Sequence, residues 1–148
     1  MTDVSPTHEW PRPRQHVSFN LPVVATGVAG VWQLAAGEAS RNYAVVVDRN
    51  TQIAVAVLFI VAAVLVITGW ALNNRSACPL RQDMGLRIKA CGLAGWSVGM
   101  VSYVVANWQL WPNPTHFFSS PATMVIAAMI PPTLHRAWVL LRPVRPIT

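Results

Sequence analysis

The amino-acid sequence predicts an all-α integral membrane protein, a four-helix transmembrane bundle of antiparallel hairpins with both termini in the cytoplasm. Of its 148 residues, 53% are hydrophobic and only 11% are charged, which is too apolar for the solvated surface of a soluble domain. The charged residues are bunched and leave uncharged runs at residues 15–37, 50–74 and 90–135. The lysines and arginines also divide unequally between the two ends of such a bundle.

The first predicted helix, near residues 21–40, gives the weakest signal of the four. Its apolar part, residues 21–37, is short and contains Thr26, two internal glycines and Gln33. Three interpretations stay open for it: a transmembrane helix, a re-entrant segment, or the core of a signal peptide behind a basic, proline-rich leader. We take it as a span because of the charge distribution described below.

The second predicted helix, residues 51–72, gives the clearest signal. The segment TQIAVAVLFIVAAVLVITGWAL has no charged residue and is apolar on every side. A helix rises 1.5 Å per residue, so about 20 residues cross a hydrocarbon core of about 30 Å. Its 22 residues greatly exceed the usual length of a strand, and lipid does not tolerate an unpaired strand. This segment is therefore predicted to span the membrane.

The uncharged run at residues 90–135 is long enough for two helices and a turn. Pro112 and Pro114 mark that turn, because proline cannot donate a helical hydrogen bond and restricts the residue before it to extended conformations. Ser120 followed by Pro121 is typical of a helix start, with a capping hydroxyl and proline at the first helical position. We therefore predict helices near residues 88–111 and 120–141.

The charge distribution favours four spans, because loops kept in the cytoplasm carry excess lysine and arginine. With four spans, Arg41 and Arg49 lie outside and the other nine cations lie inside. With three spans, the split falls to seven against four. The bundle is thus assigned to residues 17–141, between a flexible tail at 1–16 and a short basic tail at 142–148. The inside cations are Arg12, Arg14, Arg75, Arg81, Arg87, Lys89, Arg136, Arg142 and Arg145.

Small residues recur at intervals of three and four along the third predicted helix. This spacing places them on one narrow helix face, where another backbone can approach closely. In lipid, such small-residue faces favour helix association through van der Waals packing. The sequence leaves open whether this face packs within one molecule or against another copy or partner. The residues concerned are Gly92, Gly95, Gly99, Ser102 and Ala106.

The segment MIPPTLHRAW in the fourth predicted helix combines two prolines with ionisable side chains. Pro131 and Pro132 remove two helical donors, so we expect a kink near the middle of the membrane. Arg136 is close enough to the inner helix end for its side chain to reach the headgroups. A sharper hypothesis treats Pro131, Pro132, His135 and Arg136 as a hinge beside an intramembrane polar site.

The sequence carries little evidence of chemistry. Residues 95–99, GWSVG, match the G-x-S-x-G pattern of serine hydrolases, but they lie inside a predicted helix rather than at a strand-to-helix turn. A serine in that position usually bonds to its own backbone, so pairing of Ser97 with His135 is the less favoured hypothesis. Cys78 and Cys91 match no zinc pattern, and the histidines are scattered. We expect no catalytic residue, no cofactor and no metal site.

These features predict a small non-enzymatic protein of the bacterial inner membrane that acts through helix contacts, as an accessory or regulatory subunit of a membrane complex. Its expected partners are the bilayer and other membrane helices, from further copies or a larger complex, and no nucleic acid. A phage holin, which permeabilises the membrane as an oligomer, is the alternative. A small transporter is disfavoured because no Asp or Glu lies within the uncharged runs that supply the predicted spans. Ten arginines against one lysine indicate a bacterial or phage coding sequence.

Overall fold

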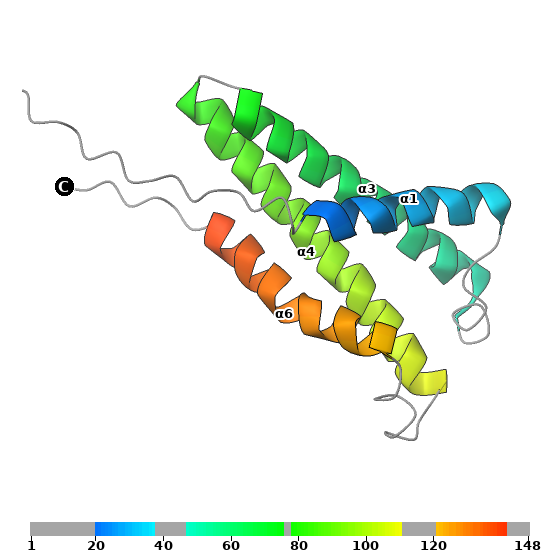
Figure 1. Ribbon diagram of the computed structural model, residues 1–148. Coiled ribbons are helices and arrows are strands. Elements are labelled where there is room, and N and C mark those ends of the chain that lie inside the picture. The colour runs from blue at the N-terminus through cyan, green and yellow to red at the C-terminus, as the bar shows by residue number, and fades with distance from the viewer. Residues whose placement is uncertain (1–19, 38–46, 76–77, 111–120, 142–148) are drawn as a thin grey trace, which may run out of the picture.

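The computed structural model describes residues 20–37, 47–75, 78–110 and 121–141, which form four α-helices (Figure 1). The all-α prediction is confirmed for these ranges. The predicted tails at 1–16 and 142–148 and the turn at Pro112 and Pro114 lie outside the described residues. The helices are α1 (Asn20–Ala36), α3 (Arg49–Arg75), α4 (Pro79–Leu110) and α6 (Pro121–Leu141).

Three helices of the described chain are long and apolar enough to cross a membrane. These candidate spans are Arg49–Arg75, Pro79–Gln109 and Thr123–Leu141. Helix α1 is apolar too, but it has only 17 residues. Length and composition are thus compatible with a membrane protein, and a fourth span through α1 stays a prediction.

Helix α4 begins at Pro79, nine residues before the predicted start near residue 88. Proline is suited to the first turn of a helix, and the Gln82 amide donates to the Cys78 carbonyl at 3.1 Å to close that turn. One turn further on, Arg87 Nε donates to Asp83 Oδ2 at 2.9 Å, a favourable pair at i and i+4. Hydropathy alone does not detect a helix that continues through charged residues, which explains the difference.

The starts and ends of α1 and α3 have local causes. Helix α1 ends at Ala36, earlier than the predicted residue 40, because Gly37 takes a left-handed conformation with φ of 69°. Asp48 caps α3: its Oδ2 accepts from the Thr51 amide at 3.0 Å and its Oδ1 from the Thr51 hydroxyl at 2.6 Å. These hydrogen bonds, the hydroxyl one foremost, hold the pKa of Asp48 below its ordinary value.

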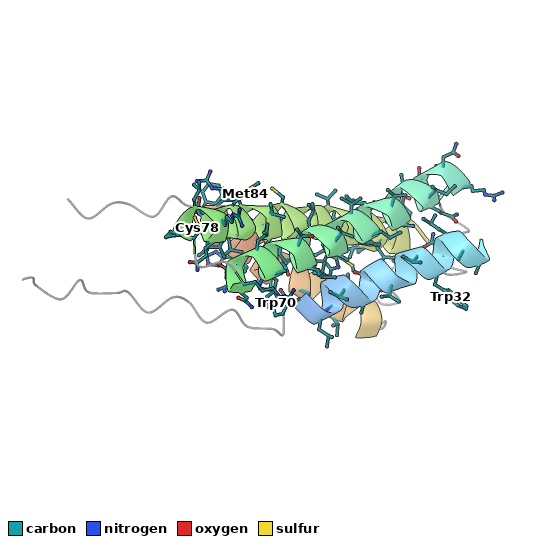
Figure 2. The ribbon with its side chains drawn as sticks, turned by 90° about the horizontal axis from the view of Figure 1, so that it is seen from above. Trp32, Trp70, Cys78 and Met84 are labelled. Carbon is teal, nitrogen blue, oxygen red and sulfur yellow. The ribbon has the colours of Figure 1, made fainter. Side chains whose placement is uncertain are left out.

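Helices α3 and α4 form the centre of the molecule, with α1 packed on α3 and α6 packed on α4 (Figure 1). Gly69 of α3 lies near Gly85 of α4, whereas Phe59 lies near Gly99, so the two helices run in opposite directions. Trp70, Cys78 and Met84 lie toward one end of the molecule, and Trp32 of α1 lies toward the other (Figure 2).

The core lies where α4 meets its neighbours. Trp96 and Leu93 are among the largest fully buried side chains, and both come from the middle of α4. Val23 from α1, Val66 from α3 and Ala137 from α6 belong to the same cluster. Many large hydrophobic side chains of the four helices are exposed, which is the pattern expected where lipid rather than water surrounds the protein.

Candidate functional site

The small-residue face of α4 packs against α3. A Cβ atom added at Gly92 would lie 2.8 Å from the Ala62 carbonyl oxygen and 2.8 Å from Val66 Cγ2, so α3 reaches the α4 backbone there. At Gly99, an added Cβ would meet the ring of Phe59. Gly95 is roomier, since an added Cβ would meet only Leu58 Cδ1, at 3.6 Å. The glycine face is thus occupied within one molecule.

The other two residues of the predicted face, Ser102 and Ala106, differ in burial. Ala106 is buried and Ser102 is half-buried. Both lie on α4 beyond Gly99, toward the end where α6 begins (Figure 1).

A close backbone approach of α3 and α4 involves two glycines that the sequence reasoning missed. A Cβ at Gly69 would lie 2.5 Å from the Gly85 carbonyl oxygen and 2.6 Å from the Lys89 amide nitrogen. A signal was present, since Gly85 precedes Gly92 by the same seven residues that separate Gly92 from Gly99. Because this helix was predicted to start near residue 88, Gly85 fell outside it and the seven-residue interval was not recognised.

Helix α1 also packs through glycines. Gly27 lies against Ala63 and Phe59, and a Cβ at Gly30 would lie 2.8 Å from the Ala56 carbonyl oxygen. The two internal glycines that weakened the prediction of this helix are therefore the residues that let it approach α3.

One side-chain hydrogen bond links α1 to α4 across 70 residues of sequence. Trp96 Nε1 donates to Thr26 Oγ1 at 2.8 Å. The Thr26 hydroxyl has backbone acceptors within its own helix, the carbonyls of Val23 at 3.0 Å and Pro22 at 3.1 Å. Thr26 thus satisfies the buried indole and links α1 to the middle of α4.

Ser97 and His135 lie in different surroundings. Ser97 is buried and its hydroxyl donates to the Leu93 carbonyl of the preceding turn at 3.0 Å. The His135 side chain is exposed on α6. The structure therefore gives Ser97 the backbone hydrogen bond typical of serine in an apolar helix.

Helix α6 continues through its two prolines. Pro131 and Pro132 lie inside the helix, and both are exposed. Thr133 is buried and donates to the Met129 carbonyl at 2.7 Å, rather than to the carbonyls of Ala127 or Ala128 that the prolines leave without helical donors. The expected kink stays a prediction.

The ionisable residues near the end of α6 differ in their surroundings. Arg136 is half-buried while His135 faces outward, so the structure gives the two residues different environments. A second cation in this part of the molecule, Lys89 of α4, is only 3% exposed, and this burial was not predicted from the sequence. Its backbone lies against Gly69 of α3.

Most of the described cations, Arg49 excepted, gather at one end of the molecule. Arg75 ends α3, and Arg81 and Arg87 lie in the first turns of α4. The opposite end of α3 carries Arg49 beside Asp48. Figure 1 shows the end of α3, the start of α4 and the end of α6 on the same side of the molecule.

A cavity of about 180 Å³ lies among all four helices and is mostly apolar. Thr26 and Gln33 of α1 and Tyr103 of α4 contribute its polar groups, and Phe59 and Ile126 contribute apolar walls. Gln33 Nε2 is 3.5 Å from the Gln52 carbonyl oxygen, at the margin of a hydrogen bond.

The described ranges bring together no group of three histidine, cysteine or acidic side chains that could hold a metal ion. Cys78 and Cys91 are both free and exposed. Comparison of this chain with protein-family models, with curated proteins and with solved structures finds no match. Any statement about its function therefore depends on the sequence and the packing of its helices.

Proposed function

We propose that this chain is a multi-pass protein of the bacterial cytoplasmic membrane that acts without catalysis, as an accessory or regulatory subunit docked on the helices of a larger membrane complex. The proposal includes four spans, arranged as antiparallel hairpins, with both termini in the cytoplasm. The clustering of Arg75, Arg81 and Arg87 at one end of the described chain supports this orientation.

The observation that carries the proposal is a difference between the inner and the outer faces of the helices. The glycines of α4 and α1 are already used inside the molecule, where they pack on α3. The outward faces of α1 and α6 remain apolar. In the most apolar stretch of α6, only 11% of the residues are buried inside the molecule. A partner helix therefore has two wide apolar faces to dock on, and Trp32 and Trp138 are large exposed side chains on these faces.

The holin hypothesis remains the competing proposal. It assigns the glycine face to self-assembly rather than to packing within one molecule. A holin must assemble with itself and permeabilise the membrane. The close-packing glycine face would be a natural surface for self-assembly. Because α3 covers that face in the monomer, its presence no longer supports an oligomer.

The test is photocrosslinking from defined faces in the membranes of the native host. A photoreactive amino acid at Val125 of α6 or Val28 of α1, both exposed, should give one defined crosslink to a different membrane protein. The same probe at Leu93, which is fully buried, is the matched control and should crosslink only within the chain. A ladder of homo-oligomers, together with dye entry into cells that express the chain, would instead establish the holin function.

A further inference from the structure

A groove of about 410 Å³ lies between the last turns of α3 and the first turn of α4. It belongs to the cationic end of the molecule and is separate from the cavity among the four helices. Its walls come from both helices, with most of them on α3. The lining residues are Ile67, Thr68, Ala71, Leu72, Arg75 and Arg81.

The chemistry of the groove changes along its length. Ile67, Ala71 and Arg75 follow one another at intervals of four, so they lie on one stripe of α3. Arg75 lies eight residues after Ile67, which corresponds to about 12 Å along the helix axis. The stripe is therefore apolar toward the middle of α3 and ends at a guanidinium. A ligand that fits it has an apolar tail and an anionic head.

Electrostatics at the cationic end favour an anion. Asp83, the nearby carboxylate, is engaged by Arg87 at 2.9 Å. Within the described chain, neither Arg75 nor Arg81 forms an ion pair with a carboxylate. Guanidinium groups bind phosphate oxygens through paired hydrogen bonds, and both side chains are exposed and line the same groove.

From this arrangement we propose that the groove binds one anionic phospholipid, with its phosphate between Arg75 and Arg81 and an acyl chain along Ile67 and Ala71. A free phosphate ion would use the two arginines but would gain nothing from the apolar wall. A zwitterionic lipid would use the wall but would offer less net charge to two cations. The site needs only a membrane around α3 and goes beyond the proposed docking role.

The test uses the full chain purified in a neutral detergent and native mass spectrometry. Phosphatidylglycerol and phosphatidylcholine with identical acyl chains are titrated separately. We expect one molecule of phosphatidylglycerol to be retained at concentrations at least tenfold below those needed for phosphatidylcholine. Equal retention of the two lipids would overturn the proposal without any variant being made.

Variants then locate the site. Arg75→Gln and Arg81→Gln should each weaken phosphatidylglycerol retention several-fold, whereas Arg49→Gln, the same change at the other end of α3, should leave it unaltered. Ala71→Phe should also weaken retention by filling the groove, with Ala54→Phe on the exposed surface of α3 as its control. An equal loss in Arg49→Gln would show a general charge effect. Displacement of the lipid by millimolar inorganic phosphate would show a site for the anion alone, and either result would refute the proposal.

Discussion

Gly92 and Gly95 lie on the same face of α4, yet the structure gives them different surroundings. Gly92 faces a backbone carbonyl of α3, which cannot move aside without shifting the helix. Gly95 faces only the end of the flexible Leu58 side chain, at an ordinary contact distance. A shared spacing in the sequence therefore does not imply a shared tolerance of substitution.

We predict that Gly92→Ala destabilises the protein and that Gly95→Ala does not. The added methyl at Gly92 overpacks the contact with α3 and should cost about 1–3 kcal/mol. At Gly95 the methyl fits, and alanine is the better helix former. Unfolding of both variants by titration with SDS from detergent micelles measures the difference. Equal loss of stability in the two variants would contradict the packing described here.

At the scale of single residues, the sequence predicted which small side chains share a face but not what covers it. Spacing along one helix locates a face, whereas the partner depends on how helices far apart in sequence meet. The hydrogen bond from Trp96 to Thr26 could not be predicted from the sequence either, since no local pattern relates residues 70 positions apart. Burial of Lys89 also required the crossing of α3 and α4 to be known.

Among the elements, α1 is short and makes few side-chain hydrogen bonds to other helices. It has 17 residues, and its main described contacts are with α3, supplemented by the hydrogen bond to Trp96 of α4. Its glycines allow a close approach but add no side-chain contacts of their own. Thr26 therefore contributes the specific interaction that holds the helix in place.

We predict that Thr26→Val weakens the attachment of α1. Valine matches the shape of threonine but leaves the Trp96 indole without its acceptor, and hydrogen bonds of this kind in membrane proteins are worth about 0.6–1.7 kcal/mol. Hydrogen exchange in micelles should show faster exchange in α1, with little change in the α3 and α4 pair. Thr68→Val, on the exposed surface of α3, is the control and should leave exchange unaltered.

At the scale of elements, the sequence predicted helix type better than helix ends. The predicted 120–141 lies within one residue of Pro121–Leu141, because Ser120 and Pro121 form a recognisable start signal. The start of α4 was missed by nine residues, because its first turns are stabilised by a charged pair that a search for apolar runs passes over.

For the whole molecule, the arrangement of the cations predicts how the chain lies in a membrane. Cys78 is exposed at the end that carries Arg75 and Arg81, while Asn50 is exposed at the opposite end of α3. Cysteine labelling can therefore distinguish the two sides, because Cys78 is a native cysteine at one end and a cysteine can be introduced at Asn50 at the other.

We predict that a membrane-impermeant maleimide labels Asn50→Cys in intact bacterial spheroplasts and labels Cys78 only after lysis. The labelling uses a Cys91→Ser background, with Cys78→Ser added when Asn50→Cys is probed. The physical reason is the retention of arginine-rich ends in the cytoplasm. Labelling of Cys78 in intact spheroplasts would invert the proposed orientation.

The unequal lengths of the helices have a mechanical consequence for the surrounding lipid. Helix α1, with 17 residues, is about 26 Å long, and α3, with 27 residues, is about 40 Å long. If α1 crosses the membrane as proposed, a hydrocarbon core of about 30 Å would have to thin beside it, whereas α3 is long enough to cross without thinning. Elastic strain would collect on one flank of the protein. A second membrane protein that covered this flank would release the strained lipid, so association at α1 would gain free energy from the bilayer itself.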